Sequence, residues 1–330
     1  MTRMPRLLLA AVLAVGLSAP RARAAEPDKL LPADADTVAV INLKQILDSA
    51  LIKKYALEQI KQALEGQDAK QLLDELGIDP LKDVEKLTIA SIDTSRDNTK
   101  FFMLVNGNFD PEKLFKTAEA YSKKDADRFS MVRDGGTVMF KFQPDDGQPP
   151  VYATVVNDKT IVAASEKKLI SNAIAADSGN KAAPLKKELA DLIKKADAKA
   201  SVYVATILKG KLDDLMIPGG GNLPIKLDDL QRVLPKLETA LISVKIGADV
   251  ALEVNFGMQD DESAGDMRNA LDDLFKQLKP LAQLAAAAEP RAKPLGDILA
   301  SLKITSKNKD VTLSGKITSD NIAQIVNPND

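Results

Sequence analysis

The chain has 330 residues, with 45 basic and 47 acidic side chains, and contains no His, Cys or Trp. Without His and Cys it cannot build Ser-His-Asp or Cys-His nucleophile systems. It also lacks the usual ligands for zinc, copper, haem and iron–sulfur clusters. No disulfide can form, so stability must come from hydrophobic cores, which a chain of this length can supply. The composition therefore excludes most common chemistries of secreted enzymes.

The first 24 residues have the pattern of a signal peptide. Arg3 and Arg6 precede the apolar run Leu7–Leu17, and Ala22-Arg23-Ala24 supplies small residues before a cut. The run is shorter than the roughly 18 residues that a membrane span needs. We therefore expect cleavage after Ala24 and export to the periplasm or the exterior. Retention of the segment as a membrane anchor stays open.

Removal of residues 1–24 takes away four Arg and no acid, which leaves 41 basic and 47 acidic side chains and a formal charge of −6. Charges of both signs are mixed along the chain instead of forming blocks, which is typical of a solvated globular surface. No segment combines a Lys/Arg excess with interleaved aromatic residues. The sequence therefore predicts neither a nucleic-acid partner nor, after cleavage, a stable membrane span.

The first half begins after a polar lead-in, residues 25–36. Patterns of β-branched and alternating apolar residues predict strands at 37–43, 87–93, 101–106, 130–133, 138–142, 152–156 and 160–164. Apolar spacings of three and four predict a helical stretch at 43–64 that breaks near Ala56, and a helix at 69–76. We expect Asp79-Pro80 and Asp110-Pro111 to start helices, and Ser165 to cap a helix at 166–176. Asp134-Gly135-Gly136 is a plausible hairpin turn.

The second half follows a polar linker at 178–184. It has predicted helices at 185–196 and 263–279, an amphipathic turn or two at 227–234, and strands at 201–208, 240–247, 250–257, 301–306 and 311–317. Pro280 is expected to kink or stop its helix, because proline lacks the amide hydrogen of the helical ladder. Ser319-Asp320 is expected to cap a short terminal helix.

The two halves, 37–177 and 185–330, share one order of elements: strand, helix, hairpin, helix, hairpin, helix. The first half has an extra hairpin. The order suggests an internal duplication of a strand-helix-hairpin-helix-hairpin unit. Hairpins imply antiparallel pairing, so the predicted class is α+β. We expect antiparallel sheets covered on one face by long amphipathic helices, as two sheets or as one continuous sheet.

Two short motifs resemble parts of the serine β-lactamase signature. Ser165 to Lys168 matches Ser-x-x-Lys, and Ser319-Asp320-Asn321 matches Ser-Asp-Asn. The third motif, Lys-Thr-Gly, is missing, and only nine residues follow Asn321. Both serines also stand where a helix cap is expected. We therefore predict no catalytic residue in either motif.

Cofactor and metal sites are not predicted either. Gly219-Gly220-Gly221 lacks the Gly-Lys-Ser/Thr ending of a phosphate-binding loop. Several acidic clusters exist, but none has the spacing of a calcium-binding EF-hand; they lie at 125–127, 145–146, 213–214, 228–229 and 260–262. Asp145-Asp146-Gly147 is the most turn-like of them, and a plain polar turn explains it. A carboxylate pair for glycoside hydrolysis stays open, although the chain has few aromatic side chains for stacking on sugars.

Residues 30–43, with Leu51–Tyr55 and Leu76–Val84, resemble the opening of exported bacterial proteins, many of them planctomycete, that lack an assigned function. The resemblance covers residues 28–90 and implies a signal peptide and an exported α+β domain. It brings no catalytic residues with it.

The predicted function is a non-enzymatic exported protein with a binding or structural role at the cell envelope. One alternative is an exported hydrolase that uses carboxylates or a metal held by oxygen ligands. A second alternative is a carrier of lipid or apolar peptide. Converging Asp, Glu and Lys side chains in a pocket would favour the hydrolase. An open groove of Leu, Ile and Val would favour the carrier.

Overall fold

A computed structural model describes residues 24–66, 73, 77–92, 100–144, 148–180, 183–212, 225–289 and 292–326. The predicted signal peptide up to residue 23, nearly all of the helix predicted at 69–76, Asp145–Gly147, Asp213-Asp214 and Gly219–Gly221 lie outside these residues. No helix within the described ranges is both long enough and apolar enough to cross a membrane.

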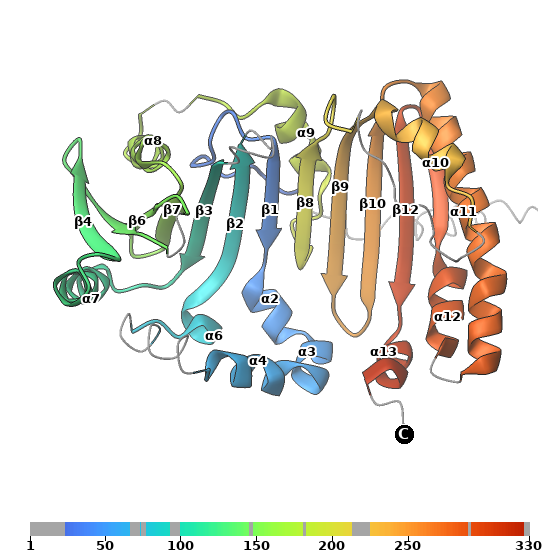
Figure 1. Cartoon of the computed structure of the whole chain (residues 1–330), viewed down its shortest axis with the longest axis horizontal. Coiled ribbons are helices and arrows are strands. Elements are labelled where there is room, and N and C mark those ends of the chain that lie inside the picture. Colours follow the sequence, from blue (N-terminus) through green and yellow to red (C-terminus); the bar gives the residue numbers. More distant parts are fainter. Residues whose placement is uncertain are drawn as a thin grey trace, which may run out of the picture.

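The fold is mixed α and β, built on one antiparallel sheet of twelve described strands (Figure 1). The strand order is β11-β12-β10-β9-β8-β1-β2-β3-β7-β6-β5-β4. The strands are β1 Thr37–Ile41, β2 Val84–Ile92, β3 Lys100–Gly107, β4 Phe129–Asp134, β5 Thr137–Phe142, β6 Val151–Asn157, β7 Thr160–Ala164, β8 Val202–Ile207, β9 Leu237–Ile246, β10 Val250–Met258, β11 Lys303–Lys307 and β12 Asp310–Ile317. The halves thus form a single continuous sheet.

The strand pair β1·β8 joins the two halves. Val38 lies opposite Ala205, and Val40 lies opposite Tyr203. From this pair outward, one side runs β1-β2-β3-β7-β6 and the other runs β8-β9-β10-β12-β11. Each side continues with the two strands of a hairpin and then with the last hairpin of its half. The extra hairpin β4·β5 forms the far edge of the first side.

The helices begin and end as follows: α2 Leu43–Asp48, α3 Ala50–Tyr55, α4 Leu57–Leu64, α6 Pro80–Asp83, α7 Pro111–Lys124, α8 Lys167–Asp177, α9 Lys187–Lys195, α10 Asp228–Val233, α11 Asp261–Ala288, α12 Lys293–Ser301 and α13 Ser319–Val326, with a 3₁₀ turn η1 at Leu234–Lys236. We name the two faces of the sheet after α9 and α11. The α9 face carries Val38 and Val40 of β1, and the α11 face carries Ala39 and Ile41 of the same strand.

Two hydrophobic cores lie on opposite faces. On the α9 face, Leu189 and Ile193 of α9 pack with Val38, Tyr203 and other inward residues of the central strands. On the α11 face, Met267 of α11 packs with Val311 and other residues around β10 and β12.

Helices therefore cover both faces, and the expectation of helices on one face is wrong. The physical reason is a change in patterning along the sheet. The central strands are apolar on the α9 face, whereas β10 and β11 expose Glu253 and Lys303 there and turn Val254 and Ile304 to the α11 face.

Local signals in the sequence are largely confirmed. The Asp110 carboxylate accepts a hydrogen bond from the amide of Lys113 at 3.0 Å and starts α7. Asp79 does the same for α6, with Pro80 as the first helical residue. Gly135 and Gly136 have φ of 55° and 89° in the β4–β5 turn, a region that favours glycine.

Two local expectations are wrong. Ser165 does not cap α8; its hydroxyl accepts from the amide of Phe101 on β3 at 3.2 Å. Ser319 is the first residue of α13, and the hydroxyl that accepts from Asn321 N, at 3.2 Å, belongs to Thr318. Of the kink or stop expected at Pro280, the stop does not occur, because α11 continues through Pro280 to Ala288. The predicted 43–64 stretch breaks at Ala56 as expected, and at Ser49 as well.

Candidate functional site

The α11 face carries an apolar row that crosses the whole sheet. The register of the strands aligns one residue from each strand perpendicular to the strand direction. From β4 to β11 this row is Met131, Phe140, Ala153, Ala163, Met103, Ile89, Ala39, Val204, Ile242, Val254, Leu313 and Ile304. Every member is apolar, although the chain as a whole is rich in charge. The burial of one strand would require apolar residues on that strand only, whereas this row is apolar on every described strand.

A second apolar row lies beside the first in the middle of the sheet. It consists of Val105, Leu87, Ile41, Val202, Val244 and Leu252. On the other side, Ser91, Thr37 and Thr206 form a row of hydroxyl groups, in which Thr37 and Thr206 hydrogen-bond at 2.7 Å. The middle of this face is therefore an aliphatic floor with a hydroxyl-bearing rim.

Helices stand at the two ends of this floor. At one end, Phe115 of α7 contacts Phe140 with ring centroids 5.5 Å apart, and Phe129 stacks on Phe140 at 5.6 Å. At the other end, Met267 of α11 packs on Val311 of β12. Both helices lie on the same face. We call the floor between them the apolar trough.

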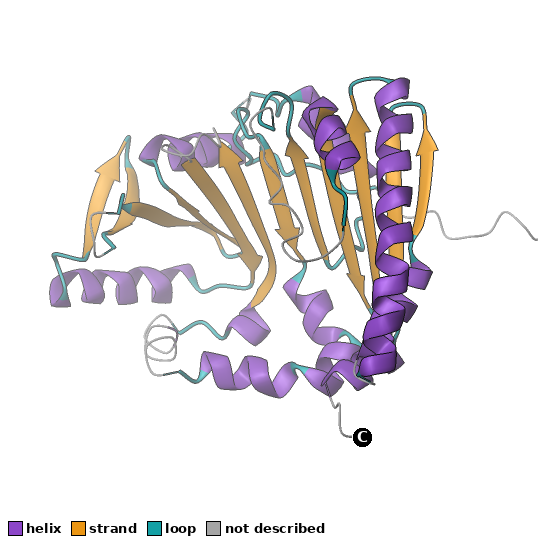
Figure 2. Ribbon diagram, turned by 45° about the vertical axis from the view of Figure 1, so that its right-hand side comes forward, coloured by secondary structure: helices purple, strands orange, loops and turns teal. Residues whose placement is uncertain are grey.

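No described helix covers the middle of the apolar trough. Figure 1 looks onto this face, and none of its helices lies in front of β2, β1 and β8; Figure 2 shows α11 standing forward of the sheet at one end. The floor residues of β1, β2, β3 and β8 are half-buried, and Ile242 is 39% exposed. Contiguous apolar surface is typical of interaction sites, which makes this partly exposed floor a candidate site.

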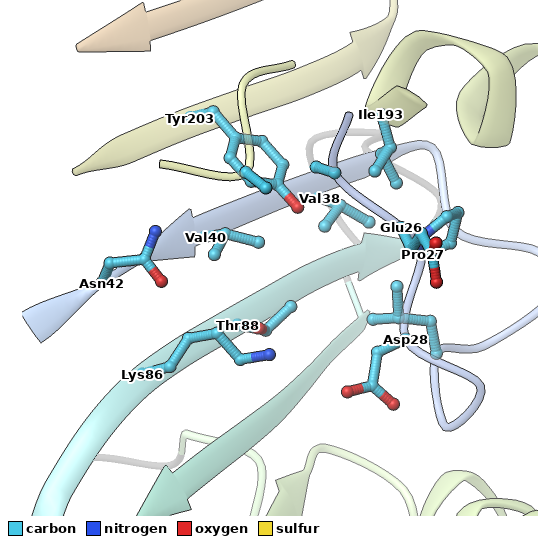
Figure 3. Close-up of a pocket in the computed structure, with 13 residues that line it drawn as sticks. Glu26, Pro27, Asp28, Val38, Val40, Asn42, Lys86, Thr88, Ile193 and Tyr203 are labelled. Atoms are coloured by element: carbon cyan, nitrogen blue, oxygen red, sulfur yellow. The ribbon is translucent and has the colours of Figure 1, made fainter. Parts of the chain in front are cut away.

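The α9 face has a different feature, a cavity of about 140 Å³ between the N-terminal segment and the strands β1, β2 and β8 (Figure 3). Its polar lining includes Lys86, Thr88, Tyr203 and Asp28. Burial, together with the nearby Asp28 carboxylate, raises the pKa of Tyr203 to about 12. The phenol is therefore neutral, and able to donate a hydrogen bond, at physiological pH.

The residues of the two β-lactamase-like motifs do not come together. Ser165 follows β7 and Ser319 follows β12, and seven strand spacings separate these strands in the sheet. At about 4.8 Å for each spacing, the serines are on the order of 30 Å apart. The two motifs therefore do not form one site.

Carboxylate chemistry finds no site in the described part of the chain. No three Asp or Glu side chains among the described residues are grouped so that they could hold a metal ion. Where the pKa of a described carboxyl is shifted, it is lowered, as at Asp36 and Asp79, which are paired with lysines. A general acid needs a raised pKa instead. The hydrolase alternative therefore lacks a favourable observation.

Comparison with protein families, with curated proteins and with solved structures gives no match to this chain.

The sequence indicated neither the trough nor the cavity. Phe101–Val105 is apolar at five consecutive positions, which predicts a strand buried on both faces. That run was the only hint of the trough in the sequence, because one of the two faces of this strand lies in the trough. The cavity could not be found this way, since its polar residues come from segments far apart in the sequence.

Proposed function

We propose that this is an exported, non-enzymatic binding protein that holds an amphiphile with a long acyl chain in the apolar trough. The observation that carries the proposal is the aliphatic floor of β3, β2, β1, β8 and β9, which no described helix covers. The acyl chain lies along the two apolar rows. The polar head faces the hydroxyl groups of Thr37, Thr206 and Ser91.

The dimensions of the trough support an acyl chain. Five strand spacings separate β3 from β10, which corresponds to about 24 Å of floor. The hydrocarbon core of a bilayer is about 30 Å thick, so one leaflet contributes chains of about 15 Å. Each buried methylene contributes about 0.8 kcal/mol. A chain of ordinary length thus fits along the floor and gains enough free energy for stable binding.

The chemistry of the floor favours an acyl chain over an apolar peptide. A peptide carries backbone amides and carbonyls, and burying these without partners costs several kcal/mol. The floor offers only side chains, because the strand backbones are already paired on both sides. A second copy of the chain is disfavoured by shape, since α7 and α11 stand at the two ends of the same face and obstruct a flat approach.

The binding experiment uses the chain without residues 1–24 and compares two Glu substitutions. Val204→Glu places a charge in the centre of the trough, whereas Ala251→Glu, the matched control, lies at an exposed position of β10 on the α9 face. We expect the parent and Ala251→Glu to bind a fluorescent fatty acid, and Val204→Glu to bind at least tenfold more weakly.

A second readout is lipid extracted from the purified protein and identified by mass spectrometry. Protein without lipid that also fails to bind the fluorescent fatty acid would overturn the proposal. A dimer whose trough is protected from hydrogen exchange would assign the surface to a second copy instead. Circular dichroism checks that Val204→Glu is folded.

Export is part of the proposal and rests on the sequence of residues 1–24. N-terminal sequencing of protein secreted from cells tests it. A mature terminus at Ala25 is expected, and full-length protein retained in the cytoplasm would contradict export.

We also propose that the two halves arose by internal duplication. Supporting this, the strand orders on either side of β1·β8 correspond, and each half has an aspartate cap after its second hairpin strand. Asp110 accepts from Lys113 N, and Asp260 accepts from Ser263 N. A twofold axis through β1·β8 would place α7 and α11 on the same face at opposite ends of the trough. Superposition of the halves in an experimental structure tests this relation.

A further inference from the structure

The cavity on the α9 face is formed by three separate parts of the chain. Lys86 and Thr88 project from β2 and Tyr203 from β8, and residues 25–28 form the opposite wall (Figure 3). The N-terminal segment is held in place by a hydrogen bond from Ala25 N to Ala196 O at 2.9 Å. The cavity is therefore a built feature of the fold and does not depend on a mobile side chain.

Two hydroxyl groups in this cavity have no protein partner among the described residues. Tyr203 is 6% exposed and Thr88 is 2% exposed. Neither side chain hydrogen-bonds to another described residue, and both line the cavity. Polar groups at such depth ordinarily have a partner. Neither hydroxyl oxygen is among the buried side-chain atoms that lack a partner, so both are open to the cavity and can bond to water or to a ligand that enters it.

Three charged side chains line the same space, the cation Lys86 and the carboxylates of Asp28 and Glu26. In Figure 3 the ammonium of Lys86 enters from β2, and the carboxylate of Asp28 enters from the N-terminal segment. No ion pair within 4 Å joins Lys86 to any acid in the described part of the chain. The carboxylate of Asp28 accepts one hydrogen bond, from Leu30 N at 3.0 Å. The cavity thus holds one cation and two carboxylates, and no described ion pair joins the cation to either of them.

We propose that this cavity binds a small zwitterion, an α-amino acid with a short side chain. Its carboxylate accepts hydrogen bonds from Lys86 and from the hydroxyl groups of Tyr203 and Thr88. Its ammonium group donates to Asp28. Charge-assisted hydrogen bonds of this type are about twice as strong as neutral ones. The apolar walls formed by Val38, Val40 and Ile193 receive the short side chain.

The size of the cavity restricts the ligand. A volume of about 140 Å³ corresponds to about five water molecules at roughly 30 Å³ each. Glycine and alanine, with five and six non-hydrogen atoms, are of this size. Amino acids with long or aromatic side chains are too large. A cavity that holds only water would show no higher affinity for a zwitterion than for a simple ion. The two affinities can be measured and compared.

The test is calorimetric titration of the chain without residues 1–24 with L-alanine, glycine, acetate and methylammonium. We expect alanine and glycine to bind at least tenfold more tightly than either single ion. Lys86→Met and Asp28→Asn should each weaken alanine binding at least tenfold, and Tyr203→Phe should weaken it severalfold. Lys44→Met is the matched control, because Lys44 is 68% exposed and pairs with Glu85 outside the cavity.

The result that overturns the proposal is equally definite. Absence of binding for all four compounds up to 10 mM, which is about the weakest affinity of interest, would leave the cavity to water. Acetate binding as tight as that of alanine, unchanged in Asp28→Asn, would make it an anion site. Chemical-shift changes in the parent protein give a readout that does not depend on the folding of any variant. None of these outcomes depends on the apolar trough, which lies on the other face.

Discussion

Asn255 of β10 and Thr312 of β12 lie opposite each other, and the Asn255 amide nitrogen donates to the Thr312 hydroxyl at 3.0 Å. The same pair of residue types recurs in the first half. Asn106 of β3 lies opposite Thr160 of β7, with the two side chains 3.5 Å apart. In both pairs the amide oxygen of the asparagine is buried without a partner. Comparison of the two linear sequences does not reveal these pairs, because only the strand register places each Asn opposite a Thr.

A double-mutant cycle should measure the coupling free energy between the Asn255 and Thr312 side chains. We expect Asn255→Val and Thr312→Val to show a coupling energy of about 1 kcal/mol, the usual net value of one hydrogen bond. The double variant should be nearly as stable as the parent, because it also removes the unpaired amide oxygen. The free energy of unfolding from urea titration is the measurement.

The pair in the first half provides the comparison. Asn106→Val and Thr160→Val should show a smaller coupling energy, because their hydrogen bond is longer. A cost above about 2 kcal/mol for Asn255→Val alone would mean that the amide oxygen does have a partner.

Asp36 should contribute a pH-dependent part of the stability. Its carboxylate, 14% exposed, pairs with Lys186 and with Lys211, the latter at 3.0 Å. Burial raises its pKa, but the two ammonium groups more than compensate, so that the pKa lies below the ordinary 3.8. A lowered folded-state pKa means that this stabilisation is complete above the unfolded pKa and is lost as pH falls through the folded one.

Asp36→Asn should therefore lower the free energy of unfolding by about 1–2 kcal/mol at pH 7. The difference from the parent should shrink as pH falls below about 4. Asp48→Asn is the control, since Asp48 and Lys53 form an exposed pair, 66% and 53% accessible, that is worth under about 1 kcal/mol. An equal effect of the two substitutions, or a difference that grows in acid, would contradict this assignment.

The features that the sequence predicts correctly are those determined by residues close to one another in the chain. Asp79 and Asp110 act on amides two and three residues away, and Gly135-Gly136 adopts the backbone of its own turn. The role of Ser165 is not local, because the amide that its hydroxyl accepts from belongs to Phe101, 64 residues away.

The two candidate sites depend on contacts that are still less local. The β1·β8 pairing brings Val40 opposite Tyr203, 163 positions later in the chain. Alternation identifies which residues share a face, but it does not say which face lacks a helix. Met103 and Leu104 are both apolar, and only the packing shows that Leu104 belongs to the core and Met103 to the trough floor.

Pro280 shows how tertiary packing can override a strong local signal, and it leads to a third prediction. α11 runs from Asp261 to Ala288 with Pro280 in its interior, and Ala282 beyond it is buried.

Proline removes one hydrogen bond of the helical ladder and costs up to about 3 kcal/mol. Pro280→Ala should therefore raise the free energy of unfolding by about 1–3 kcal/mol. Pro111→Ala, at the first position of α7, where proline is tolerated, should change it by less than about 1 kcal/mol. Thermal and urea unfolding of the two variants provide the measurement. Destabilisation by Pro280→Ala would mean that the packing of α11 requires the bend that proline imposes.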